Sequence, residues 1–233
     1  MGKDQVKQFI ISQSTFSELF WDRILSNSED FSHRRVELQR ALELQDGLRS
    51  QADYNTGSIT FCAAWSLYSL TSYFMPSNIV EIGTFIGKST ISMALALDHG
   101  GHPGLIKTCD GSNGFDINWS GETTILQNFK TISSDMMSKI DSAQDLLFAD
   151  GRLNDLDLDV MQTENFANCI FAFDDTEGVE KGFVNQFMVD QKMKNRFFIY
   201  PPSNEILKKF NFHSGSSISL SVPASMITFN RQG

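Results

Sequence analysis

The sequence has few cysteines, few basic residues and no long apolar segment, and each shortage narrows the class of protein. Only three cysteines, Cys62, Cys109 and Cys169, are scattered over 233 residues. An odd, unclustered set provides neither a disulfide framework nor the paired spacing of a zinc site. Such a set is typical of a reducing compartment, so we expect a cytoplasmic protein.

Basic residues are outnumbered by acidic ones, with 19 Lys and Arg against 28 Asp and Glu and a net charge of −9 at pH 7. Nucleic acids and anionic membrane surfaces attract proteins through basic charge. The composition therefore disfavours a nucleic-acid substrate and a membrane-surface role. The apolar piece at residues 9–11 is too short for a signal peptide, and no apolar run approaches the roughly 20 residues of a membrane span.

Familiar hydrolase patterns are also missing. The four histidines, His33, His99, His102 and His213, stand isolated in the sequence. No nucleophile-elbow pattern of the Gly-x-Ser-x-Gly type is present. The sequence therefore supports neither a Ser–His–Asp nor a Cys–His mechanism.

What the sequence does contain is a strand–turn–helix pattern between Asn78 and Leu97. An apolar run of Ile79, Val80 and Ile82 ends at Gly83, and a second glycine, Gly87, precedes a run of good helix formers. This layout is typical of a ligand site at a helix N-terminus. There, unpaired amide N–H groups favour an anionic group, and glycine lets the backbone approach a ligand closely.

Three glycine-loop motifs compete for this stretch. A phosphate-binding P-loop needs four residues between its glycine and its Gly-Lys-Ser/Thr, whereas Gly83 and Gly87 enclose only three. The dinucleotide fingerprint fails because Phe85 and Lys88 occupy its third and sixth positions. An acidic-x-Gly-x-x-x-Gly pattern is met in full, starting at Glu81. An atypical phosphate loop using Lys88 and a ligand-free turn stay open as alternatives.

The segment EIGTFIGKST at residues 81–90 resembles motif I of class I S-adenosylmethionine (SAM)-dependent methyltransferases. It is most similar to the catechol/caffeoyl-CoA O-methyltransferase-like branch, in which a Gly-Thr-Phe-x-Gly turn follows the acidic residue. The resemblance covers roughly residues 55 to 233. It implies methyl transfer from SAM to a small-molecule acceptor, at a hydroxyl group. A non-catalytic SAM-binding scaffold is a further hypothesis.

The resemblance implies an α/β fold, Rossmann-like and doubly wound. We expect a mostly parallel seven-stranded sheet with a C-terminal antiparallel hairpin in a SAM-binding domain at residues 56–233, and an N-terminal helical extension or lid at 1–55. Besides residues 79–82, the predicted strands are 105–109, 143–149, 169–173, 196–200, 217–222 and 226–230. Helices are predicted from Thr15, at 34–51, 59–74 (capped by Thr56 or Ser58), 88–97, 122–132, 153–161 and 180–193. Because the N-terminal helices are rich in Phe, we also expect a homodimer.

Acidic residues follow three of the predicted strands: Asp110, Asp150 and Asp174. Ligands in open α/β sheets lie outside the carboxyl ends of the strands. The resemblance implies that Asp110 binds the ribose, Asp150 the adenine amino group, and that Asp174 lies beside the methyl group as general base. The further cofactor contacts that it implies are Glu81, Gly83, Thr84, Phe85, Gly87, Ser89, Gly111 and Gly151.

A divalent-metal site is not expected. The metal-dependent relatives use an Asp after the fourth strand, which Asp174 matches, and an Asp-Asn pair after the fifth. Here Pro201 and Pro202 follow that strand, and neither can ligate through its side chain. The alternative left open is a site rebuilt from Asp174, Asp175 and Glu177, which supply the oxygen ligands that magnesium prefers.

Overall fold

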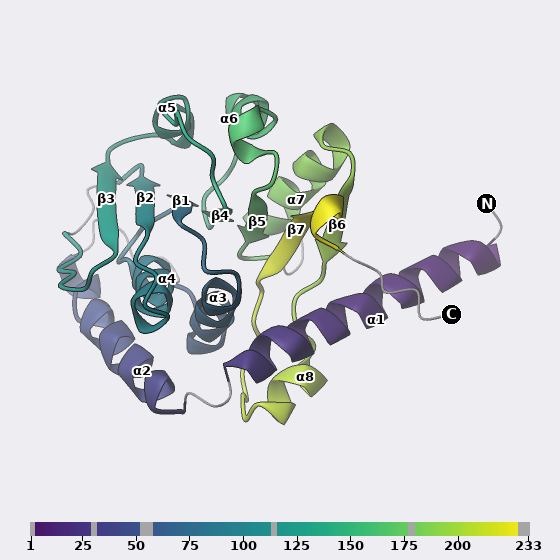
Figure 1. The fold of residues 1–233 in the computed structure, drawn as a ribbon, viewed down its shortest axis with the longest axis horizontal. Coiled ribbons are helices and arrows are strands. Elements are labelled where there is room, and N and C mark those ends of the chain that lie inside the picture. Colours follow the sequence, from purple (N-terminus) through teal and green to yellow (C-terminus); the bar gives the residue numbers. More distant parts are fainter. Residues whose placement is uncertain (1–2, 29–31, 52–57, 113–115, 177–179, 228–233) are drawn as a thin grey trace.

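Short apolar runs form the centre of a seven-stranded sheet in the order β3-β2-β1-β4-β5-β7-β6 (Figure 1). The computed structural model describes residues 3–28, 32–51, 58–112, 116–176 and 180–227. Strand β7 is antiparallel to both of its neighbours, and the other neighbouring strands pair in parallel. The strands are β1 (Asn78–Ile82), β2 (Leu105–Asp110), β3 (Thr124–Phe129), β4 (Leu146–Ala149), β5 (Ile170–Phe173), β6 (Arg196–Ile199) and β7 (Ser219–Pro223).

Helices cover both faces of the sheet because its strands bury apolar side chains on both sides. Along β1, Ile79 belongs to one buried cluster and Val80 to the other. The first cluster packs α1 (Lys3–Asn27), α2 (Ser32–Asp46), α3 (Phe61–Phe74), α4 (Lys88–His99) and α8 (Asn204–Lys209) on one face. The second packs α5 (Ser133–Met137), α6 (Asp155–Met161) and α7 (Lys181–Lys192) on the other. The predicted α/β fold with a mostly parallel sheet is confirmed.

The N-terminal helices are joined to the rest of the chain by buried contacts. Trp21 is fully buried, and its indole Nε1 donates a hydrogen bond to the Tyr200 carbonyl at 2.7 Å. In Figure 1, α1 crosses the side of the sheet where β6 lies and projects beyond it. The predicted helix start at Thr15 is wrong, because α1 begins at Lys3. The domain boundary at residue 55 stays a prediction.

Two predicted elements differ in the structure. Residues 122–132 were expected to be helical, but Thr124–Phe129 forms β3, paired in register with β2 at the edge of the sheet. This tertiary pairing, helped by β-branched residues, outweighs the local helical pattern. The antiparallel partners of β7 are β5 and β6 rather than a strand at 226–230, since Met226 lies in a 3-10 helix and residues 228–230 lie outside the described part.

The start of α3 is fixed by a different residue from those predicted. Thr60 caps the helix, and its hydroxyl accepts from the Ala63 amide at 3.1 Å. The Ser58 hydroxyl instead accepts from the Arg49 guanidinium at 2.6 Å, while Thr56 lies outside the described residues. Among the described residues, no helix combines the length and the apolar character needed to cross a membrane.

Candidate functional site

A cleft of about 640 Å³ opens where β1, β2 and β4 reach their carboxyl ends. This edge of a parallel sheet is where open α/β folds bind ligands. Six of the predicted site residues line it: Gly83, Phe85, Asp110, Gly111, Asp150 and Gly151. The structure therefore brings the glycine turn and two strand-end carboxylates to one concave surface.

The turn after β1 is pinned between the ends of β2 and β4. The Gly83 amide donates to the Cys109 carbonyl at 2.9 Å, and the Asp150 and Gly151 amides donate to the Ile82 carbonyl at 2.8 and 2.9 Å. Gly83 has φ +97°, and a Cβ there would lie 3.0 Å from the Asp150 carbonyl carbon and the Gly151 nitrogen. Only glycine fits such a conformation and such a close approach.

Gly87 is required for a different contact. It has φ +78°, and an added Cβ would lie 2.5 Å from Cδ1 of Ile117. Gly87 precedes α4 as its N-cap residue and offers no side-chain cap. The second glycine of the motif therefore lets the loop turn into α4 beneath Ile117, and it does not line the cleft.

Glu81 lies behind the cleft rather than in its wall. Its carboxylate is fully buried and accepts hydrogen bonds from the Ser89 and Thr90 hydroxyls, both at 2.5 Å. Burial raises the pKa of Glu81 above its ordinary value, and the hydroxyl donors oppose that shift. Thr84 is also buried, and its hydroxyl pairs with that of Thr108 at 2.5 Å. These residues fasten α4 and the turn to the sheet.

Asp110 joins the two sides of the cleft mouth. One carboxylate oxygen accepts from the Phe85 amide at 2.7 Å, and the other accepts from the Ser112 amide and hydroxyl at 2.8 and 2.6 Å. Phe85 itself has φ +44°, a strained conformation that this hydrogen bond supports.

Asp150 pairs with a lysine that the sequence analysis missed. The Lys181 ammonium lies 2.6 Å from Oδ1 of Asp150 and 3.1 Å from Oδ2 of Asp175. Burial, followed by the charge of Asp174, raises the pKa of Asp150 to about 7, against the opposing effect of Lys181. Lys181 also lines the cleft. A sequence signal existed, because lysine is unfavourable at the first position of a helix unless an acid offsets its charge.

Asp174 is held on the β7 side of β5. It is buried and accepts a hydrogen bond from the Ser217 hydroxyl, while the Thr176 hydroxyl donates to the Ser217 carbonyl at 2.5 Å. Burial raises the pKa of Asp174, with the Ser217 hydrogen bond opposing. Asp174 does not line the cleft, so its role as general base stays a prediction.

Lys88 and Ser89, which motivated the phosphate-loop alternative, are engaged elsewhere. The Lys88 ammonium lies 3.0 and 2.9 Å from the two carboxylate oxygens of Asp46 on α2. The Ser89 hydroxyl donates to Glu81. Neither side chain lines the cleft, which weighs against an atypical phosphate loop.

No protein-family model matches the sequence, and no curated protein matches it. Solved structures do match the fold. One is the O-methyltransferase TomG from Streptomyces achromogenes in complex with SAM, with 15% identity, 78% of this chain and 89% of that chain covered, and a TM-score of 0.52. Another is an O-methyltransferase from Bacillus cereus in complex with SAH, with 15% identity, 88% and 98% covered, and a TM-score of 0.53.

A methyltransferase from Geobacter sulfurreducens gives a similar match, with 12% identity, 79% of this chain and 89% of that chain covered, and a TM-score of 0.53. At these identities the likeness concerns the fold. The chain therefore has a Rossmann-like methyltransferase fold, and its cleft lies at the ligand-binding edge of that fold.

Proposed function

We propose that this protein is a SAM-dependent methyltransferase that methylates a hydroxyl group of a small molecule. One observation carries the proposal: Gly83 lies against the backbone at Asp150 and Gly151, in a cleft that also exposes the Asp110 and Asp150 carboxylates. The turn leaves no room for a side chain, as expected where a backbone must lie close to a ligand. The fold shared with the matched methyltransferases supports the same assignment.

The residues present fit the cofactor. We assign Asp110 to the ribose hydroxyls, Asp150 to the adenine amino group, and the turn from Gly83 to Phe85 to the methionine end. Bound SAM supplies a methyl group activated by its sulfonium. The protein then has to align the acceptor and remove its hydroxyl proton. We assign that proton to Asp174, because burial raises its pKa and makes its carboxylate a stronger base than an ordinary aspartate.

The residues present do not fit the metal site of the catechol-type enzymes. Asp174 is hydrogen bonded to Ser217, and prolines follow Tyr200. Among the residues that the structure describes, there is no group of three or more His, Cys, Asp or Glu able to hold a metal ion. Glu177 lies outside them. We therefore propose a reaction in which side chains alone handle the proton.

The remaining expectations belong to the same proposal. The three cysteines are free and buried, which supports a reducing, cytoplasmic location. The net charge of −9 supports a small-molecule acceptor rather than a nucleic acid. Homodimer formation is a further proposal, to be checked by light scattering.

Calorimetric titration with S-adenosylhomocysteine (SAH) tests the cofactor assignment, with ATP and magnesium as the competing ligand. We expect one SAH site per chain and no heat from ATP. Binding of ATP without binding of SAH would instead support a nucleotide-binding module. Given SAH binding, a screen of hydroxylated acceptors with radiolabelled SAM separates an enzyme from a non-catalytic scaffold, which would transfer no methyl group to any of them.

A further inference from the structure

The cleft at the carboxyl ends of β1, β2 and β4 contains a lysine that the glycine-turn motif does not explain. Lys181 is the first residue of α7, and its ammonium lies 2.6 Å from Oδ1 of Asp150. Both side chains line the cleft. Because the N-terminus of a helix carries a partial positive charge, a lysine is unfavourable there unless other charges stabilise it.

The backbone that carries Lys181 is packed tightly against the end of β5. A Cβ added to Gly182 would clash with the Asp174 carbonyl, and the Gly182 amide donates to the Asp175 carbonyl at 3.2 Å. Asp175 has φ +53°, a left-handed conformation that is costly for a residue other than glycine. Such strained residues cluster at ligand sites. The lysine therefore extends into the cleft from a fixed point.

Two carboxylates stabilise the Lys181 ammonium. Besides Asp150, Oδ2 of Asp175 lies 3.1 Å from its Nζ. Burial disfavours the charged form of Lys181, but the two carboxylates outweigh burial and raise its pKa above the ordinary value. An ammonium has three donor hydrogens. Among the described residues, these two ion pairs account for two of the three.

Asp150 and Lys181 place an acceptor and a donor side by side. Oδ1 of Asp150 faces the ammonium, and Oδ2 is the second acceptor of the same carboxylate. The Asp150 and Lys181 side chains are 15% and 30% exposed, so a ligand in the cleft can reach both while most of each is screened from water. Adenine offers the complementary pattern, a 6-amino donor next to a ring nitrogen that accepts.

We propose that Lys181 binds the adenine base of the cofactor, donating a hydrogen bond to the ring nitrogen beside the 6-amino group that Asp150 accepts. The pair then selects a base with a donor at position 6, where the deaminated base has an acceptor. The inference rests on the proposed function and adds a specificity-determining residue to the same cleft. N1 and N7 both lie beside the 6-amino group, and the test decides between them.

The test is calorimetric titration of the full chain at pH 8, where the Asp150 carboxylate is ionised. The ligands are SAH and three analogues in which CH replaces one ring nitrogen: 1-deaza-SAH, 7-deaza-SAH and 3-deaza-SAH. Either the 1-deaza or the 7-deaza analogue should bind about twentyfold more weakly than SAH, as loss of a charge-assisted hydrogen bond implies. The 3-deaza analogue is the chemical control, because N3 lies on the far side of the base, and it should bind within about threefold of SAH.

Lys181→Met removes the donor and should abolish the difference between SAH and the affected deaza analogue. Lys88→Met is the matched control. Lys88 is also the first residue of its helix and is also paired with an aspartate, Asp46, at 2.9 Å, but it does not line the cleft. This variant should keep the difference of about twentyfold.

Asp175→Asn keeps the test decisive if Lys181→Met fails to fold. Asparagine tolerates the φ of Asp175, while the loss of charge weakens the hold on the ammonium. The difference between SAH and the affected deaza analogue should shrink by about threefold.

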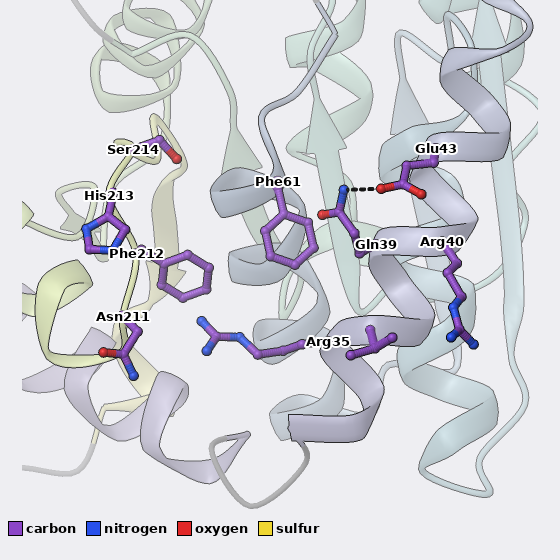
Figure 2. A pocket seen from close by; sticks show the side chains of 10 residues that line it. Arg35, Gln39, Arg40, Glu43, Phe61, Asn211, Phe212, His213 and Ser214 are labelled. Carbon is purple, nitrogen blue, oxygen red and sulfur yellow. Dashed lines mark hydrogen bonds between the residues drawn. The ribbon is translucent and has the colours of Figure 1, made fainter.

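A second concavity supplies a control for the place of binding. It has a volume of about 740 Å³, lies between α2 and residues 211–214 (Figure 2), and shares no lining residue with the cleft. It also contains a donor–acceptor pair, because the Gln39 amide donates to Oε1 of Glu43 at 2.8 Å. Gln39→Met should leave SAH affinity and the order of the analogues unchanged. A changed order would place the base in this concavity and overturn the assignment to Lys181.

Two further results would overturn the inference. In the first, the 1-deaza and 7-deaza analogues both bind as tightly as SAH. In the second, the weaker binding of one analogue persists at full size in Lys181→Met. SAH binding together with either result removes the role of Lys181 alone, whereas absence of SAH binding removes the proposed function and this role with it.

Discussion

The four strand-end carboxylates of the predicted site divide into two pairs. Asp110 and Asp150 line the cleft, whereas Glu81 and Asp174 are bonded to hydroxyl groups inside the protein. The buried position of Glu81 follows from the alternation of side chains between the two faces of the sheet along β1. Ile79 and Glu81 point to the face that α4 covers, and Ile82 packs on the opposite face. A carboxylate in a cofactor motif can therefore shape the motif without contacting the cofactor.

The comparison predicts that changes at the cleft alter binding, while changes behind it alter stability. The largest effect is expected for Gly83→Val. A side chain there meets the backbone of Asp150 and Gly151 at 3.0 Å, so SAH affinity should fall by about a thousandfold or more in calorimetry. Gly101→Val is the matched control, because Gly101 has φ +64° but no atom within 4 Å of the added Cβ. Equal losses of affinity in both variants would contradict the assignment.

Glu81→Ala should chiefly destabilise the fold. It leaves the buried Ser89 and Thr90 hydroxyls without their acceptor, so the free energy of unfolding should fall by about 3 kcal/mol in urea denaturation. Glu81→Gln keeps an acceptor and should lose about 1 kcal/mol or less. Its SAH affinity should remain near that of the wild type. A large loss of SAH affinity in Glu81→Gln, with stability unchanged, would instead assign Glu81 to cofactor binding, as for Asp110 and Asp150.

Asp110→Ala should weaken SAH binding by about thirtyfold, since it removes the acceptor assigned to the ribose and the support of the Phe85 amide. Asp98→Ala is its control. Asp98 also accepts three hydrogen bonds, from the Glu122 amide and from the amide and hydroxyl of Thr123, but it does not line the cleft. Thermal unfolding should show similar destabilisation in the two variants. Only Asp110→Ala should lose affinity for SAH, and an equal loss in Asp98→Ala would assign the effect to folding.

The smallest effect is a pH dependence at Asp150. Its pKa of about 7 means that the carboxylate forms as pH rises through neutrality. A charged acceptor binds an amino group more strongly, so SAH affinity should rise by about fivefold between pH 6 and pH 8. Asp150→Asn, which cannot ionise, should show no such rise in titrations across the same range. If SAH affinity rose equally in Asp150→Asn, the pH dependence would have to come from another titrating group.

The same shift predicts the sign of a stability change. An ordinary aspartate loses its proton near 3.8, so the unfolded chain releases this proton at lower pH than the folded chain does. Between about pH 4 and pH 7 the folded state holds the extra proton, and the contribution of Asp150 to the free energy of unfolding falls as pH rises. Asp150→Asn should show a smaller fall than the wild type in that range.

The sequence was sufficient to predict the central strands and the glycine turn. Residues 170–173 are apolar throughout, and residues 79–82 are apolar except for Glu81, because both faces of these parallel strands are buried. It was insufficient for β3, an edge strand with half-exposed side chains whose pairing with β2 depends on tertiary contact. It also missed Lys181, which reaches Asp150 only because α7 packs its first turn against the end of β5.

A crystal structure of the full chain grown with SAH tests the central claim most directly. We predict SAH in the cleft at the carboxyl ends of β1, β2 and β4, with its ribose hydroxyls within hydrogen-bond distance of Asp110 and its adenine amino group within that distance of Asp150. SAH bound elsewhere, or a cleft that stays empty at saturating SAH, would contradict the assignment of this cleft as the cofactor site.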